Sequence, residues 1–519
     1  MIEIKEADIP PECLGITGFV TLEKSTEKDI KLSNELELTL INTKEFMSKL
    51  EIEHRKETLN KLEELCNLWI YEKALQNYYP KKTASKIKGK LFAFGSYRLN
   101  TDFIGADIDT LLVCPQFISR EEFFKELYEY LQNCSLVKDI LVLPDAFVPL
   151  MTMKLCDVEI DLLFASIDES TVPGNLNLND NTEQLMRRMD EKNIRSINGV
   201  RVTDDLLTLV YNKNAFRTAL RTIKLWSKRC GIYSNAMGFL GGVSWAILVA
   251  RVCQLWPTAS SFTIVTKFFY FFGIKWKWPT PILLRKITSS SVLSLPQWNP
   301  QTNPKDSYHV FPIITPSYPC QNSTYNVTES HKTIIINHMK NAHELCQQIA
   351  NGNKKLSDLF ESKFFFTYQH YLMVTIKDSD ESQFNKNSSL IESKLRIFAR
   401  YLEKNESIAL VHINVQTFNC HEMDKSGKTS QYVNRWFLGF EVLMKSKKSL
   451  SVADEISKFE SLVKIEIEVV HVKKSNVPQY LSDKDKNKFL LFLPRKSRKR
   501  PTAGNELFNT SEAKRQKVA

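Results

Sequence analysis

Three kinds of segment are missing from this sequence of 519 residues. Its ten cysteines form no CxxC pair, its first residues show no charged stretch followed by an apolar one, and its longest uncharged apolar run, 237–250, contains three glycines. Paired cysteines mark disulfide frameworks and zinc sites, and about 20 apolar residues are needed to cross a bilayer. We therefore predict a soluble protein of a reducing, intracellular compartment, with no signal peptide and no membrane contact.

Apolar and basic residues, in contrast, are plentiful. Hydrophobic residues make up 43% of the chain, aromatic residues make up 11%, and the formal net charge is +11. A chain of this length exceeds a single hydrophobic core, and a length rule predicts roughly three domains. The positive charge favours a nucleic acid or a polyphosphate as partner.

The stretch 91–115 combines a Gly-Ser turn with two acids. The turn, Gly95–Ser96, follows an apolar run, and Asp107 and Asp109 lie two residues apart inside a second apolar run. Alternate residues of a strand point to the same face, so both carboxylates are predicted to project side by side. Such a pair is costly unless a divalent cation neutralises it. Backbone N–H groups and the hydroxyl at the turn would form an anion site for a triphosphate.

A third acid, Asp161, is embedded in the apolar run 158–165. Asp157 and Glu159 share its parity along the strand, so alternation alone leaves the choice among the three open. Any single buried Asp is more often a structural ion pair than a ligand. Three carboxylates brought together on neighbouring strands, however, could hold two Mg²⁺ ions that activate a hydroxyl and neutralise a leaving phosphate.

Two clusters of positive charge follow. Residues 214–230 contain no Asp or Glu, and they place on one helix face a ridge formed by Arg217, Arg221, Lys224 and Lys228. Such a ridge is commonly a solvated helix face, but the missing acids favour a phosphate of a nucleotide or RNA.

Residues 495–517 hold eight basic and two acidic residues, a net charge of +6. This pattern is typical of a nuclear import signal or an RNA-contacting tail.

Hydrophobic periodicity predicts a multidomain α+β protein. In the first two thirds we expect strands over 140–143, 148–155 and 158–165, and helices over 54–79, 119–134, 214–230, 238–256 and 331–362. In the last third we expect helices over 389–405 and 453–463, and strands over 364–376, 408–418, 436–444 and 465–472. Strands that alternate with two helices predict a small α/β sandwich in this last part.

Six blocks make the chain resemble a known family. They are GSYRL…GADIDTL, VEIDLLFA, RSINGVRVTDDLL, LRTIKLWSKRCGIYSN, GFLGGVSWAILVARVCQLWP and FPIITPSYPCQNSTYNVT. In this order they are similar to the blocks of eukaryotic nuclear poly(A) polymerases, which are nucleotidyltransferases of the polymerase-beta-like type. The Gly-Ser…Asp-x-Asp pattern alone marks only the wider superfamily, whereas the later blocks are specific to poly(A) polymerases.

The resemblance implies a domain order and an activity. It implies an N-terminal segment with a nucleotidyltransferase catalytic domain over 1–175, a helical central domain over 176–345, an RRM-like α/β sandwich that binds RNA over 346–480, and a basic, disordered tail with a nuclear localisation signal over 481–519. The implied activity is the transfer of AMP from ATP to the 3′ end of RNA without a template. The implied cofactor is Mg²⁺, with Mn²⁺ as a possible substitute. We expect a nuclear monomer that works with mRNA cleavage and polyadenylation factors.

The resemblance also assigns site residues. Asp107, Asp109 and Asp161 match the catalytic, metal-binding triad, which selects Asp161 from the three acids that alternation left open. The triad and eight further residues match ATP-binding positions, and these eight are Phe94, Gly95, Ser96, Lys224, Tyr233, Asn235, Gly242 and Val243. Within this set Lys224 matches a lysine that reaches the triphosphate, and Tyr233 and Asn235 match residues near the adenine and ribose. Gly242 and Val243 match a backbone contact to the nucleotide.

One segment departs from the family pattern. Between Leu99 and Gly105 the family has a Gly-x-His-x-Lys-like run, and this chain has Asn-Thr-Asp-Phe-Ile instead. A basic residue is therefore absent, and an acid, Asp102, has appeared. This departure leaves open an RNA-binding paralogue with little catalysis. A related transferase with another nucleotide choice, such as a uridylyltransferase, is the third alternative.

Overall fold

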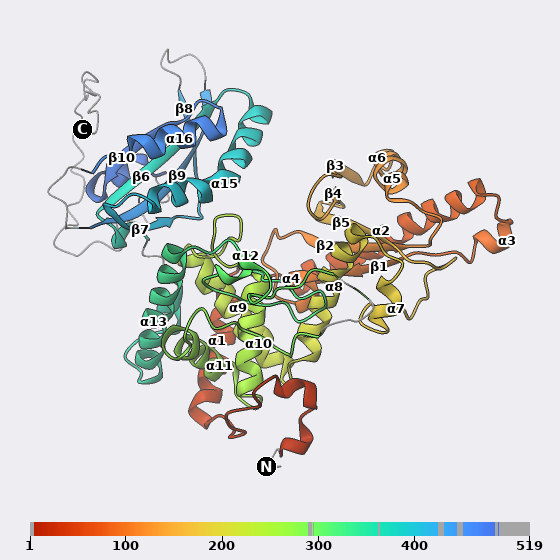
Figure 1. Cartoon of the computed structure of the whole chain (residues 1–519), viewed down its shortest axis with the longest axis horizontal. Helices are drawn as coiled ribbons and strands as arrows, with labels where there is room; N and C mark the ends of the chain where they lie inside the picture. Colours follow the sequence, from red (N-terminus) through yellow and green to blue (C-terminus); the bar gives the residue numbers. More distant parts are fainter. Residues whose placement is uncertain are drawn as a thin grey trace. The chain divides into compact units, whose positions relative to one another are not determined.

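The computed structural model describes residues 5–288, 293, 295–361, 364–423, 430–443, 450–482 and 486. The chain forms two compact units, each of which is built from several segments. The first unit contains Met1–Leu225, Gly242–Tyr325 and Lys340–Leu359, and the second contains Trp226–Gly241, Asn326–Met339 and Phe360–Ala519. The elements of both units can be followed in Figure 1.

The first unit contains a mixed sheet of five strands. They are β1 (Lys90–Ala93), β2 (Ile108–Cys114), β3 (Val137–Leu143), β4 (Leu150–Leu155) and β5 (Val158–Ser166), in the spatial order β1-β2-β5-β4-β3. β2 and β5 are parallel, and the other neighbours are antiparallel. The strands predicted near 140, 148 and 158 are confirmed.

Helices cover both faces of this sheet, which explains why β2 reads as an almost continuous apolar run. α2 (Lys49–Gln76) packs on the face of Ile108 and Leu112, and α8 (Glu191–Thr208) packs on the face of Leu111 and Val113. α5 (Arg120–Glu122), a π-helical turn (Phe123–Leu127) and α6 (Tyr128–Gln132) join α2.

α2 begins earlier than the predicted residue 54 because its start is capped. Ser48 Oγ accepts the Glu51 N–H at 3.3 Å, and the Glu51 carboxylate accepts the Ser48 N–H at 2.7 Å. This reciprocal pair is a capping box, which satisfies N–H groups that a helix start leaves without partners.

One mostly apolar helix is buried among the other helices of the first unit. α10 (Gly242–Leu255) is buried from Ser244 to its end, as its apolar sequence predicts. Its neighbours include α4 (Gly95–Leu99), α8 and α11 (Ser261–Tyr270), which continues into the π-helical turn Phe271–Lys275. α11 in turn contacts α1 (Glu27–Asn42), and α9 (Lys213–Arg229) follows α8 in the chain. α3 (Lys81–Ala84), α7 (Thr182–Met186), α12 (Pro304–Ser307), α13 (Glu329–Ala350) and short 3₁₀ turns at Glu6–Asp8, Pro11–Leu14 and Leu356–Phe360 complete the series. The final residues of α9 and the first part of α13 belong to the second unit.

The second unit is an antiparallel sheet with two helices on one face. The strands are β6 (His370–Asp378), β7 (Ile408–Ile413), β8 (Phe418–Met423), β9 (Ser430–Val442) and β10 (Glu468–Lys473), in the order β10-β6-β9-β7 with β8 beside β9. α15 (Glu381–Glu403) and α16 (Ala453–Val463) pack on it through residues such as Phe398 and Phe459 (Figure 1). The predicted α/β sandwich is confirmed, and a 3₁₀ turn follows at Lys474–Tyr480.

The prediction of one strand over 364–376 is wrong in its first part. Residues Phe364–Thr367 form α14, and its aromatic rings pack against Tyr371 and Phe437 of the sheet. Tyr371 and Phe437 are both fully buried. The aromatic residues that suggested a strand therefore serve as a cover for the sheet face opposite α15 and α16.

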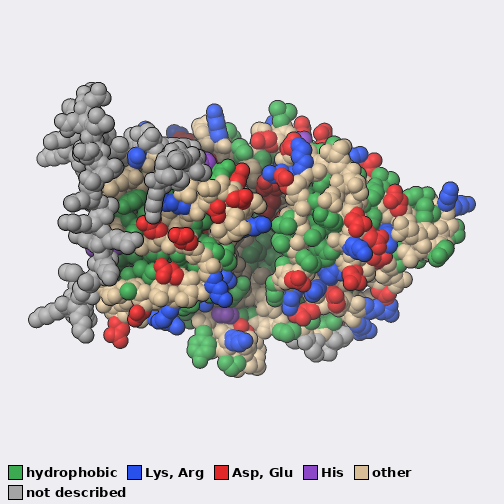
Figure 2. All heavy atoms as spheres, turned by 90° about the horizontal axis from the view of Figure 1, so that it is seen from above, with side chains coloured by type: hydrophobic (Ala, Val, Ile, Leu, Met, Phe, Trp, Pro, Cys, Tyr) green, Lys and Arg blue, Asp and Glu red, His purple; other side chains and the backbone are tan. Residues whose placement is uncertain are grey.

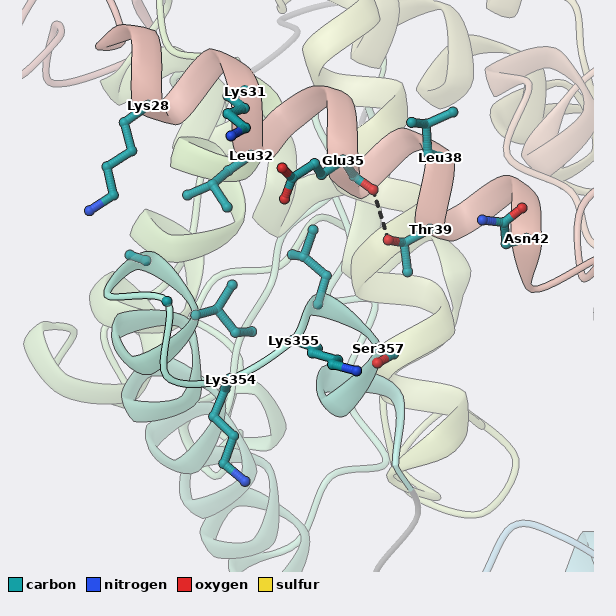
Figure 3. A pocket seen from close by; sticks show the side chains of 14 residues that line it. Lys28, Lys31, Leu32, Glu35, Leu38, Thr39, Asn42, Lys354, Lys355 and Ser357 are labelled. Carbon is teal, nitrogen blue, oxygen red and sulfur yellow. Dashed lines mark hydrogen bonds between the residues drawn. The ribbon is translucent and has the colours of Figure 1, made fainter.

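None of the helices in the described part of the chain combines the length and apolar character that crossing a bilayer demands. Charge is mixed over the face of the molecule seen in Figure 2, where Lys and Arg side chains alternate with Asp and Glu. A cavity of about 580 Å³ lies between α1 and the residues that follow α13 (Figure 3). It is lined by one acid, Glu35, and by four lysines, Lys28, Lys31, Lys354 and Lys355.

Candidate active site

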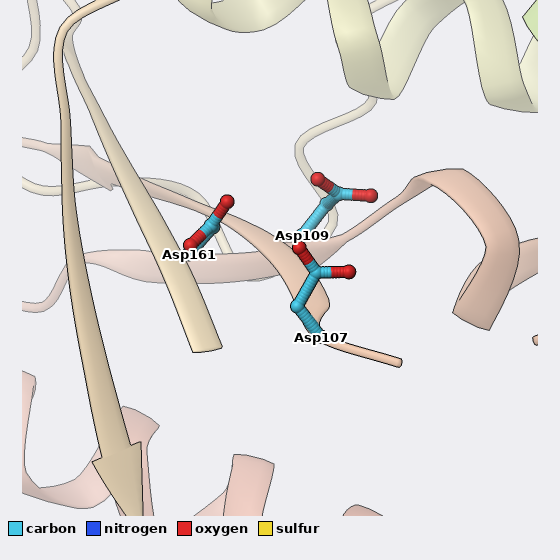
Figure 4. A group of neighbouring side chains, drawn as sticks. All are labelled: Asp107, Asp109 and Asp161. Atoms are coloured by element: carbon cyan, nitrogen blue, oxygen red, sulfur yellow. The ribbon is translucent and has the colours of Figure 1, made fainter. Parts of the chain in front are cut away.

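The register of two parallel strands brings the predicted acids together. Asp109 of β2 lies directly opposite Asp161 of β5, and Asp107 precedes Asp109 by two residues. Asp109 has the same strand parity as Leu111, and Asp161 has the same parity as Leu163, and both of these leucines face α8. The two acids therefore project to the same face of the sheet. Figure 4 shows the three side chains as neighbours, with Asp109 and Asp161 on adjoining strands and Asp107 just before the first of them. Carboxylate oxygens of all three lie within 4.8 Å of one another.

The alternatives for the third acid have other partners. Glu159 lies 3.5 Å from the Lys154 ammonium, and Asp157 lies 3.1 Å from the Lys138 ammonium. Both acids are therefore paired with exposed lysines and lie outside the cluster. Asp161 is the acid of this strand that joins the cluster.

The electrostatics of the cluster fit a bound cation. Burial, followed by the carboxylates of Asp107 and Asp161, raises the pKa of Asp109 to about 7, and Lys224 opposes this shift. Burial, followed by Asp107 and Glu159, raises the pKa of Asp161 to about 6. For Asp109 the shift corresponds to roughly 4 kcal/mol of ionisation cost at neutral pH. A divalent cation among hard carboxylate oxygens removes this cost, so the donor set suits such an ion.

Gly95 allows Asp109 to lie against the backbone of the turn. Its φ is +61°, and a Cβ added there would lie 2.3 Å from Asp109 Oδ2. Any side chain at this position would displace the carboxylate. The N–H of Gly95 donates to Thr203 Oγ1 of α8 at 3.1 Å. The turn is thus fixed from both sides, and its N–H group already has a partner within the protein.

The basic ridge on α9 contacts backbone carbonyl groups. Arg217 Nε donates to Leu99 O at 3.2 Å, Arg221 Nε donates to Asn100 O at 2.9 Å, and Lys224 Nζ donates to Thr101 O at 2.8 Å. The sequence left two interpretations of this ridge, a solvated helix face and a phosphate site. In the structure, three of its four cations donate hydrogen bonds to backbone carbonyl groups. Lys224 is buried, yet it is near enough to Asp109 to lower the pKa of that carboxyl group.

Comparison with known proteins identifies the family. Three profiles match in succession: the poly(A) polymerase nucleotidyltransferase domain over 15–210, the poly(A) polymerase central domain over 215–362, and the poly(A) polymerase predicted RNA binding domain over 363–431. The poly(A) polymerase of Schizosaccharomyces pombe is 41% identical over 399 residues, which are 77% of this chain and 70% of that protein. The enzyme of Candida albicans is 38% identical over 426 residues, 82% of this chain and 76% of that protein.

The chain belongs to the poly(A) polymerase family.

Two further comparisons complete the picture. A poly(A) polymerase of Dictyostelium discoideum is 38% identical over 91% of this chain, and the chain spans 60% of the length of that protein. The solved structure of Cid1 in complex with its short product ApU is 15% identical, covers 64% of this chain and 99% of its own, and superposes with a TM-score of 0.44. The family assignment rests on the sequence relatives and not on this weak superposition.

The other residues expected at a nucleotide site fall in both units. Gly242 and Val243 begin α10 in the first unit, where the N–H groups of a helix start lack intrahelical partners. Phe94 and Ser96 flank Gly95, and the Phe94 ring packs against Gly199 of α8. In the second unit, Lys228 lies over the Tyr233 ring at 5.6 Å, and Asn326 Nδ2 donates to Asn235 O at 3.2 Å.

Sequence reasoning missed Arg55, which contacts the backbone of the triad. Its guanidinium donates to Ala106 O at 2.6 Å and to Asp107 O at 3.1 Å. A signal was present, because Arg55 falls at helical spacing from the buried Leu62, Cys66 and Trp69. A charged side chain on the buried face of a helix needs a hydrogen-bond or ion-pair partner.

Proposed function

We propose that the protein is a poly(A) polymerase that adds AMP from ATP to the 3′ end of RNA without a template. The observation that carries this proposal is the convergence of Asp107, Asp109 and Asp161 at one edge of a parallel strand pair. The membership of the chain in the poly(A) polymerase family supports the choice of substrates. The raised pKa values of Asp109 and Asp161, beside the buried Lys224, suit a site that binds a cation and transfers a nucleotide.

The proposed metal ligands are the three Asp carboxylates, and the proposed ion is Mg²⁺, with Mn²⁺ as a possible substitute. Two such ions would supply charge neutralisation at the leaving pyrophosphate and would lower the pKa of the attacking 3′ hydroxyl. The contribution of the chain itself is preorganisation. β2 and β5 fix the spacing of Asp109 and Asp161, and Gly95 leaves room for the Asp109 carboxylate.

The proposed nucleotide contacts use the other assigned residues. Lys224 would bind the triphosphate, since its ammonium already lies near the cluster and carries a charge that phosphate oxygens complement. Phe94, Gly95 and Ser96 would contact the nucleotide from the turn. The N–H groups of Gly242 and Val243 would donate to it, and Tyr233 and Asn235 would lie near the adenine and ribose.

The proposed organisation follows from the family. We propose the domain boundaries 1–175, 176–345, 346–480 and 481–519, with a monomer as the working form. Proposed partners beyond ATP and RNA are the mRNA cleavage and polyadenylation factors, which would supply the choice of transcript. A nuclear location is proposed from the basic tail, whose residues from 487 onward lie outside the described residues.

Primer extension with each nucleotide separately tests this proposal. The protein, Mg²⁺ and an oligo(A) primer are incubated with ATP, UTP, GTP or CTP, and Asp107→Ala serves as the inactive control. We expect extension with ATP to exceed extension with the other three at least about tenfold. Faster extension with UTP would identify a uridylyltransferase. RNA binding with no extension above the Asp107→Ala control would identify an RNA-binding paralogue.

A further inference from the structure

Residues 99–107, here called the 99–107 segment, connect α4 to the first acid of the triad. Five backbone carbonyl groups of this segment accept hydrogen bonds from basic side chains. Those of Leu99, Asn100 and Thr101 face α9, and those of Ala106 and Asp107 face Arg55 of α2. Two helices that are distant in sequence therefore hold the segment from both ends.

Arg55 and Asp102 form the buried centre of this arrangement. Asp102 Oδ2 lies 3.3 Å from Arg55 Nη2, and the two side chains are 7% and 5% exposed. The same Nη2 donates to Asp107 O at 3.1 Å, while Nη1 donates to Ala106 O at 2.6 Å. Asp102 thus pairs with the very nitrogen that contacts the backbone of Asp107.

This geometry defines a specific task for the acid. A guanidinium donates from a rigid planar fork, so fixing one of its nitrogens fixes the direction of the others. The Asp102 carboxylate also neutralises a cation that is buried away from water, which an unpaired arginine would otherwise leave uncompensated. It faces a second cation as well, because its charge acts on the Arg221 guanidinium.

We propose that Asp102 and Arg55 are a positioning pair that holds the Asp107 backbone in place and thereby sets the metal affinity of the triad. Asp102 is not a metal ligand in this account, since its carboxylate pairs with Arg55 and is not part of the three-acid cluster. Asp102 belongs to the run that departs from the family pattern. In this account it supports the metal site and does not weaken it. This inference rests on the proposed metal-binding function of the triad.

Groups that orient metal ligands through hydrogen bonds commonly change metal affinity by 10- to 100-fold when they are removed. We therefore expect Asp102→Asn to weaken binding of Mn²⁺ by about tenfold or more. Arg55→Lys keeps the positive charge but offers a single ammonium in place of the fork, so we expect a similar loss. If both residues act on the same backbone, the double variant should bind about as weakly as either single variant.

The experiment measures Mn²⁺ binding by electron paramagnetic resonance to the full-length chain in the absence of nucleotide and RNA. The matched control is Asp168→Asn, which removes an Asp paired with Arg188 two residues beyond the end of β5. Each affinity is calculated per mole of folded protein, and the folded fraction is taken from the melting curve of the metal-free variant. Arg55→Lys provides the same test if Asp102→Asn does not fold.

The outcomes separate the inference from the function on which it rests. The inference is supported if Asp102→Asn and Arg55→Lys both lose affinity while Asp168→Asn keeps it. It is overturned if both of the first two variants bind Mn²⁺ within about twofold of the wild type while Asp107→Asn loses binding. If Asp107→Asn also binds normally, the proposed metal site itself is wrong. Additive losses in the double variant would contradict a shared backbone target.

Discussion

At the scale of single residues, the site depends on one glycine and one carboxylate that occupy adjoining space. The sequence predicted a turn at Gly95 and an acid at Asp109, but it gave no sign that they touch. A Cβ added at Gly95 would lie 2.3 Å from Asp109 Oδ2, and this closeness is visible only in the folded chain. It arises because β1 and β2 are paired neighbours, so that Phe94 N–H donates to Asp109 O at 3.0 Å.

Gly95→Ala is predicted to abolish most activity. The added methyl group displaces the Asp109 carboxylate, and a shift of about 1 Å at a reacting centre lowers the rate by roughly 100-fold. The matched control is Gly18→Ala, because Gly18 also has a positive φ, +71°, but no atom within 4 Å of the added Cβ. Primer extension measures the rates. Equal effects of the two substitutions would show that backbone strain, and not the displaced carboxylate, is responsible.

Lys224→Met is predicted to raise the KM for ATP and to lower kcat/KM by about tenfold or more, because one charge-assisted contact to phosphate is lost. Lys213→Met, at the exposed first residue of the same helix, should leave both constants unchanged. Steady-state kinetics with varied ATP distinguishes the two variants. An unchanged KM in Lys224→Met would mean that this lysine only binds the carbonyl of Thr101.

At the scale of elements, alternation and capping explain which parts could be predicted. Alternation was enough to place Asp107 and Asp109 on one face, and the family resemblance was needed to select Asp161. The register that sets Asp161 opposite Asp109 required the folded chain. The cover formed by α14 could not be predicted, because aromatic residues favour a strand as readily as a buried helical turn. The partners of the α9 ridge were also hidden, since backbone carbonyl groups leave no trace in a sequence.

The second unit is predicted to lose stability in mild acid through histidines whose pKa values are lowered by burial, among them His331 and His412. Burial, with smaller contributions from nearby arginines, lowers the pKa of His331 to about 3, and burial with the neighbouring His338 lowers the pKa of His412 well below its ordinary value. A depressed folded pKa means that the stability is present above about 6.5 and is lost as the pH falls. At pH 5.5 the loss amounts to about 1.4 kcal/mol for each histidine.

Thermal denaturation between pH 7.5 and 5.5 measures this effect. His412→Asn should flatten the pH dependence by about one proton, even though it also removes the 2.9 Å hydrogen bond between His412 Nδ1 and the Tyr368 hydroxyl. The exposed His421→Asn is the control and should leave the slope unchanged. A slope that stays the same in His412→Asn would contradict the assignment of the lost stability to this residue.

At the scale of the whole molecule, the charge is divided between described units of mixed sign and a basic terminal segment. The segment 495–517 alone contributes +6 of the net +11. On the face of the molecule drawn in Figure 2, basic and acidic side chains are interspersed. Length and charge predicted a multidomain protein with a nucleic acid or a polyphosphate as partner. The embedded acids and the family resemblance predicted an enzyme, and the course of the 99–107 segment required the folded chain.

Removal of residues 491–519 is predicted to abolish nuclear accumulation and to leave primer extension close to that of the full chain. Microscopy of a fluorescent fusion and the extension assay measure the two properties separately. A truncated protein that still accumulates in the nucleus would contradict the role of the basic segment as an import signal. A truncated protein that binds RNA with a smaller salt dependence would identify it as an RNA contact.

The central claim is that three carboxylates on two parallel strands form one metal site for AMP transfer. The most direct measurement is the rate of oligo(A) extension with ATP and Mg²⁺ for the wild type and for Asp107→Asn, Asp109→Asn and Asp161→Asn. The account predicts extension by the wild type and a loss of about 1,000-fold or more in each variant, because each removes a ligand from the same site. Wild-type extension that persists in any one of the three variants would contradict it.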